Sequence, residues 1–368
     1  MPLQASWHPM EAEVINAALA ICKNWAQGVP RPGQSVVAAH LMETSATEGG
    51  SPMKAMVIDE FGGADKLHWA ELPTPVPGPG EVLIKVAATS VNPVEWKIRE
   101  GYLAKAFPHR FPLILGWDAA GTIAGLGEGV TSFQPGDAVY AYCRKPEIQW
   151  GTYAEYVTMP AEAVAPAPRN IPLEAAATLP LVGLTSWQVL FDAAQLRSGQ
   201  TALIHAGAGG IGSLAIQLAK VRGARVLTTA RTENHEYVRS LGTDEAIDYA
   251  AEPFADAVRR LAPEGVDVVF DAVGGQTQAD SWPVLQKGGI LVSIVDRPDQ
   301  TLAEKLGVRA AYVFVAPNGG QLRELAALVE AGKVKAPTYE MLPLEKAAEA
   351  QERNRARHLR GKIVLKIA

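Results

Sequence analysis

The chain has 368 residues, of which 48% are hydrophobic and 20% charged, and this length and composition predict a globular protein of two domains. A formal net charge of −5 gives no electrostatic basis for binding nucleic acid or an anionic membrane. Cys22 and Cys143 are too few for a disulfide framework, so we expect a reducing, cytoplasmic location.

Residues 1–52 differ in composition and apolar pattern from the rest of the chain. The spacing of their apolar residues predicts one amphipathic helix, followed by a segment rich in Pro, Gly, Thr and Ser; these apolar residues are Val14, Ile15, Ala18, Leu19, Cys22 and Trp25. No secretory signal is expected, because no basic region precedes a continuous apolar core. The extension is open to three interpretations: a docking arm, an upstream addition before a natural start at Met53, or partial disorder.

Short strands and turns follow from Met53. The strands are predicted over 54–58, 81–86, 121–125, 137–142 and 152–157, and a Pro/Gly-rich connector spans 73–80. This pattern predicts a compact, mainly β domain.

After Pro168 the pattern changes to alternating helices and strands. The apolar window 175–194 contains Pro180, Gly183 and Asp192, so it predicts a buried core helix rather than a membrane span. Apolar strand-like runs then end at His205, Thr229, Tyr249, Phe270, Val295 and Val315. Repeated βαβ units predict a doubly wound parallel sheet. A last helix is expected over 321–331, and a last strand over 362–367 that joins the sheet of the first domain.

The sequence HAGAGGIG at 205–212 lies between an apolar strand and a helical pattern. Gly207, Gly209 and Gly212 satisfy G-x-G-x-x-G, where small residues permit a tight turn and close approach of a pyrophosphate. Backbone N–H groups and the positive end of the helix favour an anion there. We therefore predict a dinucleotide site that also includes Gly210 and Ile211.

The second strand of this unit ends at Thr229, which is expected to contact the cofactor, and is followed by Arg231, near the position where an acid would hold the adenosine ribose of NAD. A guanidinium pairs with a 2′-phosphate, whereas a carboxylate repels it, so the pattern favours NADPH. A merely solvated Arg231, or a ribose contact from Glu233, is the alternative.

Metal catalysis has little support in the sequence. The seven histidines show no paired spacing, and neither cysteine has a neighbouring cysteine, so no zinc ligand set is predicted. His205 is interpreted as a packed strand residue. A G-x-S-x-G hydrolase elbow is also absent.

Four segments taken together resemble the zinc-independent quinone oxidoreductase branch of the medium-chain dehydrogenase/reductase superfamily. They are SVNPVEWKIREG (90–101), LGWDAAG (115–121), HAGAGGIG (205–212) and RGKIVL (360–365). The resemblance spans 53–368 and implies a GroES-like, mainly β catalytic domain with a Rossmann domain inserted in it. The implied boundaries are 53–173 and 316–368 for the catalytic domain and 174–315 for the Rossmann domain.

The resemblance also implies roles for single residues. Asn92 stands where zinc-dependent relatives carry their first Cys ligand, and Trp117 stands at the His of their Gly-His-Glu segment, so catalytic zinc is not expected. Asn92 is expected beside nicotinamide and substrate as a donor or positioning residue, although an Asn before Pro93 also caps turns. Trp96, Trp117 and Tyr153 are candidates for the cleft wall, or ordinary core aromatics. Further cofactor contacts are expected from Thr185, Tyr249, Val273, Phe314, Val315 and Lys362.

Without a Lewis acid, alcohol oxidation is disfavoured, whereas a quinone or α,β-unsaturated carbonyl accepts hydride directly. We therefore expect an NADPH-dependent reductase of these small molecules, forming a homodimer by family analogy. The alternatives are an enoyl-thioester reductase and an NADPH-binding sensor or structural protein without significant turnover.

Overall fold

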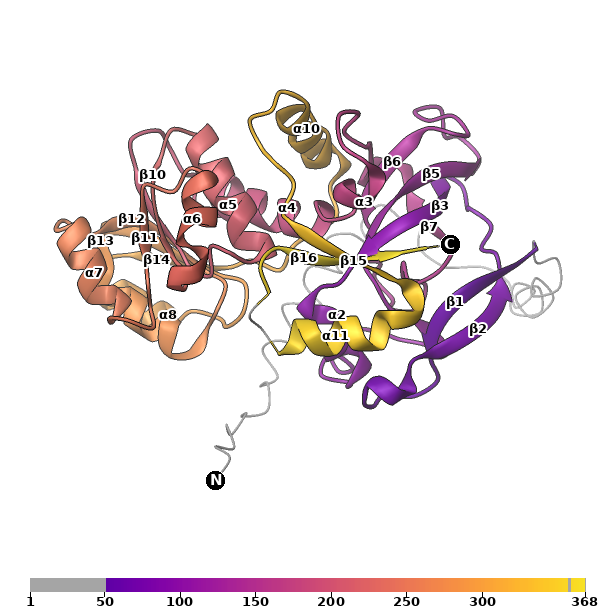
Figure 1. The fold of residues 1–368 in the computed structure, drawn as a ribbon, viewed down its shortest axis with the longest axis horizontal. Coiled ribbons are helices and arrows are strands. Elements are labelled where there is room, and N and C mark those ends of the chain that lie inside the picture. Colours follow the sequence, from indigo (N-terminus) through magenta and orange to yellow (C-terminus); the bar gives the residue numbers. More distant parts are fainter. Residues whose placement is uncertain (1–50, 357–358, 368) are drawn as a thin grey trace, which may run out of the picture.

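The computed structural model describes residues 51–356 and 359–367. The amphipathic helix expected near the N-terminus lies outside the described residues. Two groups of elements lie side by side in Figure 1: a mainly β part built from the first strands and the chain's last segment, and an α/β part built from the middle of the chain. This is the predicted fold class.

The mainly β part begins with β1 (Pro52–Ile58), which pairs with β2 (His68–Pro73) and β4 (Leu113–Ile114) in a three-stranded sheet. A seven-stranded sheet follows the order β15-β16-β3-β5-β6-β8, with β7 also paired to β3. Its strands are β3 (Glu81–Ser90), β5 (Asp118–Leu126), β6 (Ala138–Tyr142), β7 (Tyr156–Pro160), β8 (Val164–Pro166), β15 (Tyr339–Pro343) and β16 (Lys362–Lys366). Helix α2 (Pro93–Arg99) follows β3 directly and packs against α11 (Ala347–Arg355).

The α/β part contains a six-stranded parallel sheet in the order β11-β10-β9-β12-β13-β14. Numbered from β9 as the first strand, this is the doubly wound order 3-2-1-4-5-6. The strands are β9 (Thr201–Ile204), β10 (Arg225–Thr229), β11 (Glu245–Ile247), β12 (Val266–Asp271), β13 (Leu285–Ser293) and β14 (Arg309–Tyr312). The helices between them are α5 (Gly210–Val221), α6 (His235–Ser240), α7 (Phe254–Leu261), α8 (Gly275–Ser281) and α9 (Gln300–Leu306), whereas α10 (Gly319–Glu330) follows the last strand and packs against β8.

The two faces of the parallel sheet belong to different cores. Leu203 on β9 packs with Phe254 and Trp282 on one face, whereas its neighbours Ala202 and Ile204 join a core that continues into the mainly β part. Side chains alternate between the faces of a strand, and here both faces are covered. One continuous core therefore connects the two parts.

The predicted core helix over 175–194 is divided in the structure. Helix α3 (Leu173–Ala176) ends before Pro180, α4 (Pro180–Trp187) begins there, and a π-helical segment spans Gln188–Ala193. Proline has no N–H to continue a helix but suits its first turn, which explains the break. The prediction of burial holds, and no helix among the described residues is long and apolar enough to cross a membrane.

Strand limits also differ from the predictions. The strand expected over 152–157 is β7, shifted toward 160, because the fully buried side chains of Thr152 and Tyr153 belong to a bend rather than a ladder. The third, fifth and sixth strands of the parallel sheet end before their apolar runs do, at Ile247, Ser293 and Tyr312. The fourth strand ends at Asp271, one residue after its predicted end. The boundaries 173/174 and 315/316 between domains stay a prediction.

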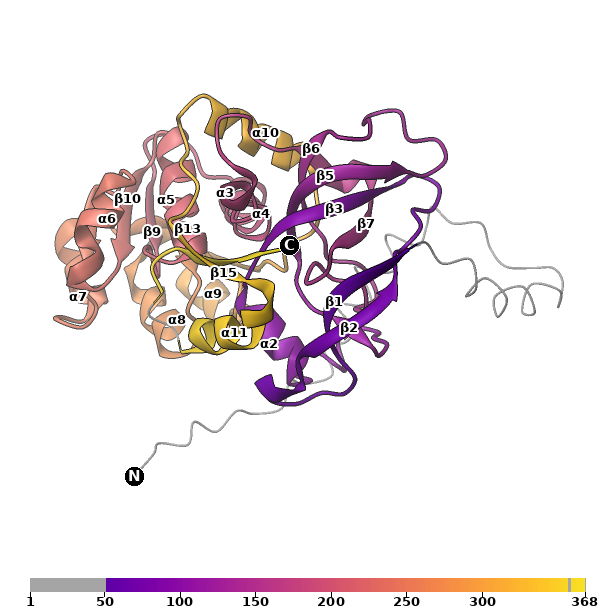
Figure 2. The same cartoon turned by 45° about the vertical axis from the view of Figure 1, so that its right-hand side comes forward.

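Strand β16 brings the last residues of the chain to the centre of the molecule. It joins the sheet of the mainly β part, as predicted, where it pairs antiparallel with β3 and parallel with β15. Figure 2, which turns the molecule by 45°, shows the yellow C-terminal strands between the α/β part and the purple β3. Just before β16, the N–H of Gly361 donates to the carbonyl of Ala208 (2.9 Å), so the C-terminal segment contacts the glycine turn directly.

Candidate active site

The glycine turn connects β9 to α5, as the sequence indicates. Gly209 is the N-cap of α5, and no side chain caps the helix. The first N–H groups of a helix have no intrahelical acceptors, and the helix dipole adds about half a positive charge at that end. The turn therefore presents the chemistry that binds a pyrophosphate.

The three fingerprint glycines have different surroundings. A Cβ on Gly212 would lie 2.3 Å from the carbonyl oxygen of Ala206, and one on Gly207 would lie 2.1 Å from Thr228 Oγ1. The fold itself therefore requires glycine at both positions. A Cβ on Gly209 would meet only the carbonyl oxygen of Ala206 at 3.4 Å. The absence of a side chain at Gly209 thus leaves space for a ligand rather than for the chain, and this fits a dinucleotide phosphate.

The left-handed residue of the turn is not a glycine. Ala206 has a φ of 56°, and its N–H donates to Thr229 Oγ1 (3.1 Å). Thr229 also accepts the N–H of Gly207 at its carbonyl and contacts His205 Nδ1 with its hydroxyl (3.1 Å). A non-glycine residue in this region is strained, and such strain is held only by surrounding contacts. Thr229, predicted as a cofactor contact, here supports the turn.

His205 is packed in the core, as predicted, but it lies in the turn directly after β9 rather than in the strand. It is fully buried, its Nε2 contacts Ser281 Oγ (2.9 Å), and its ring packs edge-on against Phe254. Burial lowers the pKa of His205 to about 4, so the imidazole is neutral at neutral pH.

Arg231 and Tyr249 lie together beyond the ends of β10 and β11. Arg231 is exposed, and its Nε donates to the Tyr249 hydroxyl (3.3 Å), which raises the pKa of the guanidinium further. Asp248 lies nearby and accepts from the hydroxyl and N–H of Thr232. The structure thus joins two of the predicted adenosine-side residues, with one carboxylate in the same neighbourhood.

A buried polar cluster lies where β3 ends. Asn92 is the N-cap of α2, and its N–H donates to Glu95 Oε2 (2.8 Å) in the manner of a capping box. Its Nδ2 donates to Asp118 Oδ2 (2.8 Å), and its Oδ1 accepts from Lys362 Nζ. Tyr153 donates to Glu95 Oε2 (2.7 Å). Three predicted residues, Asn92, Tyr153 and Lys362, therefore meet in one cluster.

The amide of Asn92 is fully engaged in this cluster. Besides Asp118, its Nδ2 reaches the carbonyl of Ser90 and Glu95 Oε1, both at 3.3 Å. An amide nitrogen has two hydrogens to donate. The contacts therefore favour the positioning role predicted for Asn92 over the donor role.

Asp118 links the cluster to α4 and to the last strand. It accepts from Ser90 Oγ (2.6 Å), from the N–H of Leu181 in the first turn of α4 (2.7 Å) and from Lys362 Nζ (3.2 Å). An acid at a helix N-terminus is stabilised by the helix dipole, and a buried charge requires partners of this kind. Asp118 therefore fixes the relative positions of β3, α4 and β16.

Burial has the largest effect on the carboxyl group of Glu95. It is fully buried, and burial raises its pKa to about 7, although the N–H of Asn92 and the hydroxyl of Tyr153 oppose this shift. Burial and the neighbouring Glu95 raise the pKa of Tyr153 well above its usual value. Tyr153 therefore remains a hydrogen-bond donor at neutral pH.

The other predicted residues have different surroundings. Trp117 is buried and packs edge-on against Tyr142, with ring centroids 5.9 Å apart, one residue from Asp118. Trp96 is not brought into the cluster: its ring contacts Tyr102 (6.0 Å) and Arg355 (5.1 Å) beside α11.

The predicted nicotinamide-side residues come from α4 and from two loops after strands of the parallel sheet. Thr185 is buried in α4 and donates to the carbonyl of Leu181 (2.7 Å). Val273 donates to Asp271 Oδ1 (3.0 Å), Val315 is buried, and Phe314 packs against Phe107 (5.5 Å). Their cofactor contacts stay a prediction.

Sequence reasoning gave no role to Glu95 or Asp118. The spacing Asn92-x-x-Glu95 is a capping-box signal that could have identified Glu95. Asp118 had no comparable local signal, because its partners lie 26 and 244 residues away along the chain.

The described residues contain no group of three or more His, Cys, Asp or Glu side chains that could hold a metal ion. Asn92, which the family resemblance places at the position of the first zinc ligand, contacts the ammonium group of Lys362. The positive charge in this cluster is therefore that of the Lys362 ammonium group.

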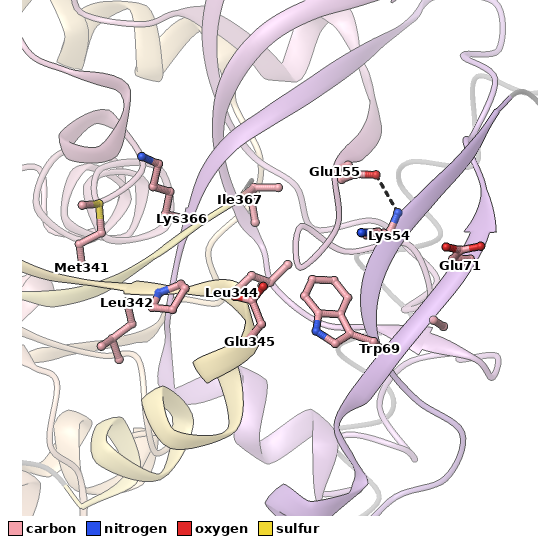
Figure 3. A pocket seen from close by; sticks show the side chains of 12 residues that line it. Lys54, Trp69, Glu71, Glu155, Met341, Leu342, Leu344, Glu345, Lys366 and Ile367 are labelled. Carbon is pink, nitrogen blue, oxygen red and sulfur yellow. Dashed lines mark hydrogen bonds between the residues drawn. The ribbon is translucent and has the colours of Figure 1, made fainter.

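A cavity of about 700 Å³ lies elsewhere, between β1, β2 and the end of β15 (Figure 3). Trp69, Met341 and Leu344 provide part of its apolar wall, and the N–H of Lys54 donates to Glu155 Oε2 (2.7 Å) at its edge. Lys366 and Ile367 of its lining lie at the opposite end of β16 from Lys362. The cavity is therefore separate from the polar cluster.

Comparisons with known proteins cover both parts of the chain. Residues 78–169 match the family described as alcohol dehydrogenase GroES-like domain, and residues 241–365 match the family described as zinc-binding dehydrogenase. The chloroplastic NADPH-dependent alkenal/one oxidoreductase of Arabidopsis thaliana is 37% identical over 323 residues, covering 85% of this chain and 79% of that protein. The chloroplast envelope quinone oxidoreductase homolog of the same plant is 32% identical over 331 residues, covering 86% and 99%. The structure of the quinone oxidoreductase from Coxiella burnetii superposes with a TM-score of 0.78 at 34% identity, covering 86% and 100%.

The doubly wound sheet, the glycine turn at its central strand and the mainly β part completed by β16 define a two-domain, dinucleotide-binding oxidoreductase fold. The matches extend over both parts in the same order. The chain belongs to the quinone oxidoreductase-like branch of the medium-chain dehydrogenase/reductase superfamily.

Proposed function

We propose that this protein is a zinc-independent, NADPH-dependent reductase of quinones and α,β-unsaturated carbonyls. The observation that carries the proposal is the direct junction between the two predicted half-sites. Gly361 donates to Ala208 of the glycine turn, and the next residue, Lys362, contacts Asn92. A cofactor bound at Gly209 would therefore extend toward the polar cluster.

NADPH, when bound, supplies the hydride that reduces the acceptor. The chain's contribution is to bind and orient. The glycine turn and the start of α5 hold the pyrophosphate, and Arg231 with Tyr249 holds the 2′-phosphate. Lys362, whose Cγ would lie 2.9 Å from a Cβ on Gly210, orients the amide of Asn92 beside the phosphate site.

Names of relatives support the acceptor class. One relative is named as an alkenal/one oxidoreductase, and two others are named as a quinone oxidoreductase or its homolog. Alkenals, enones and quinones are all conjugated carbonyl compounds. Such acceptors need no Lewis acid to take a hydride, which is consistent with Asn92 and Trp117 at positions where zinc-dependent relatives carry ligands.

The experiment is an oxidation panel with the full chain, in which NADPH and NADH are each tested with quinones, alkenals and enoyl thioesters. We expect NADPH oxidation with quinones or alkenals, and unchanged rates after exhaustive chelation. Loss of activity on chelation, restored by zinc, would overturn zinc independence. A protein that binds NADPH in a direct titration but reduces no acceptor is a sensor or structural protein, and reduction of thioesters alone identifies an enoyl-thioester reductase.

Two further expectations stay predictions. A homodimer through the free edge of β14 is tested by sedimentation equilibrium. The cytoplasmic location inferred from the cysteine count is tested by fractionation, since the plant relatives named above are chloroplastic.

A further inference from the structure

The proposed function leaves one chemical need unmet. When a conjugated carbonyl takes a hydride, negative charge develops on its oxygen, and donors aimed at this oxygen stabilise the transition state. Asn92 is engaged with Asp118, Ser90 and Glu95, so another group must serve.

Tyr142 lies beside the cluster with an unused hydroxyl. It ends β6 and is directly opposite Asp118 in the antiparallel β5–β6 pair, so both side chains project from the same face of the sheet. Its side chain is fully buried against Trp117. Its hydroxyl has no hydrogen-bond partner among the described residues.

Arg144, two residues further on, shares this feature. Its Nε is buried without a hydrogen-bond partner, and no carboxylate of the described residues forms an ion pair with it. Its Cζ lies 5.3 Å from the ring centroid of Phe314, which follows β14 in the other domain and packs against Phe107. Arg144 thus lies at the junction of the two domains, next to a predicted nicotinamide-side residue.

The two groups are close enough to influence one another. Burial raises the pKa of the Tyr142 hydroxyl, and the Arg144 guanidinium partly opposes this effect. The hydroxyl therefore stays protonated at neutral pH, and the guanidinium is always charged. The hydroxyl and the guanidinium can both donate hydrogen bonds, and the guanidinium adds a positive charge, so together they are suited to an oxygen anion.

An unused buried donor costs about 1–3 kcal/mol in the folded protein, so two adjacent ones require an explanation. We propose that the Tyr142 hydroxyl and the Arg144 guanidinium bind the carbonyl or quinone oxygen of the acceptor. This inference rests on the proposed function and deepens it by assigning the residues that recognise the acceptor's oxygen.

The step balances without any additional reagent. The acceptor carbon gains the hydride with its electron pair, the conjugated π pair moves to the oxygen, and the nicotinamide is oxidised. Tyr142 and Arg144 donate hydrogen bonds to the oxygen as its charge develops. Water supplies the proton that completes the reduction.

The first experiment compares Tyr142→Phe with Tyr140→Phe in the full chain. Tyr140 lies two residues earlier on the same face and is equally buried. Its hydroxyl already donates to the carbonyl of Leu322 (2.5 Å), so it is not free to bind the substrate oxygen. Loss of one transition-state donor lowers kcat by about 100-fold. We expect this loss in Tyr142→Phe with NADPH affinity unchanged, and near-native kcat in Tyr140→Phe. Equal kcat in Tyr142→Phe and the native chain would overturn the inference.

A second variant tests Arg144 independently of Tyr142. We expect Arg144→Met to lower kcat about 100-fold and Arg144→Lys to recover part of it, since an ammonium keeps the charge but not the guanidinium geometry. If Met and Lys give the same rate, the charge has no role and the assignment of Arg144 is wrong.

The third measurement needs no turnover. p-Nitrophenol carries a phenolic oxygen like that of a reduced quinone, and its anion absorbs at a different wavelength from the phenol. With NADP⁺ present, we expect the native chain to bind the anion preferentially and Tyr142→Phe to lose this preference. If the native chain reduces no acceptor, the proposed function fails, while anion binding still decides the donor assignment. Identical spectra for the two proteins would refute that assignment.

Discussion

The ammonium of Lys362 lies 3.2 Å from Asp118 Oδ2, and both side chains are buried. The two residues are separated by 244 positions and come from strands at different places in the sheet. Their contact connects β16 to β5, which begins at Asp118. Removing one partner of a buried ion pair leaves an uncompensated charge.

Lys362→Met should therefore destabilise the fold strongly. We expect the free energy of unfolding in urea to fall by about 3–5 kcal/mol. Lys366→Met is the matched control, because Lys366 is exposed on the same strand, and it should change stability by less than about 0.5 kcal/mol. Equal, small effects of the two variants would show that the Lys362–Asp118 contact contributes little.

Two alanine variants separate binding from folding in the glycine turn. Gly209→Ala should fold normally, since its Cβ meets nothing closer than 3.4 Å, but should lose NADPH affinity by at least tenfold. Gly212→Ala should instead lower the melting temperature, because its Cβ would lie 2.3 Å from the Ala206 carbonyl oxygen. Calorimetry and fluorescence titration measure both quantities. Unchanged NADPH binding in a folded Gly209→Ala protein would show that the pyrophosphate does not bind at this turn.

Relief of backbone strain should be visible at Ala206. Glycine adopts a φ of 56° without the steric penalty of alanine, so Ala206→Gly should raise the free energy of unfolding by about 0.5–1 kcal/mol. Ala208→Gly, in the same turn but not at positive φ, should lower it by a similar amount because the unfolded chain gains freedom. Destabilisation by both substitutions would mean that the methyl group of Ala206 has a packing role that outweighs its strain.

Arg231→Ala should weaken NADPH binding by about 10- to 100-fold, since a hydrogen bond to a charged group contributes about 1.5–3 kcal/mol. NADH affinity should change by less than about twofold, because NADH lacks the 2′-phosphate. Arg239→Ala, an exposed arginine on α6, controls for a general loss of positive charge. Isothermal titration of the native chain and both variants with NADPH and with NADH measures these affinities. Similar weakening for both cofactors would show that Arg231 does not bind the 2′-phosphate.

Stability should depend on pH through His205. Its pKa is lowered to about 4 in the folded chain, below the usual 6.5, so between these values the unfolded chain binds more protons. Its contribution to stability is therefore complete above pH 6.5 and decreases as the pH falls toward 4, by about 3 kcal/mol at most. Replacing it by Gln should flatten this part of the stability curve. An unchanged slope in His205→Gln would assign the acid sensitivity to other groups.

Glu95 should act in the opposite direction. Its folded pKa of about 7 exceeds the usual 4.5, so its contribution decreases as the pH rises from 4.5 to 7. The two effects overlap between pH 4.5 and 6.5. Urea unfolding of Glu95→Gln across this range, compared with the native chain, separates them.

Much of the architecture could be predicted because it depends on local patterns. The apolar runs around β9 and β10 and the spacing of Gly207, Gly209 and Gly212 are visible in adjacent residues. The division of the core helix at Pro180 was missed, since burial was inferred from composition whereas continuity depended on one missing N–H.

The site could be predicted only in part, for a related reason. Asn92, Tyr153 and Lys362 were identified from family resemblance, but the groups that fix them are brought together by pairing between distant strands. Tyr142, for example, reaches Asp118 only through the β5–β6 register. The engagement of the Asn92 amide likewise depends on partners that no local spacing indicates.

The contact between Gly361 and Ala208 has a consequence for how the protein is made. Gly361 has a φ of 71°, and a Cβ there would lie 1.8 Å from the carbonyl oxygen of Thr338, so no other residue fits at this point. Ala208 is translated more than 150 residues before Gly361, so its neighbour is synthesised only after all six strands of the parallel sheet. A nascent chain can therefore complete the parallel sheet before the last contact of the glycine turn is available. Loss of residues 361–367 would remove β16 together with the contacts that Gly361 makes with Ala208 and Lys362 makes with Asn92.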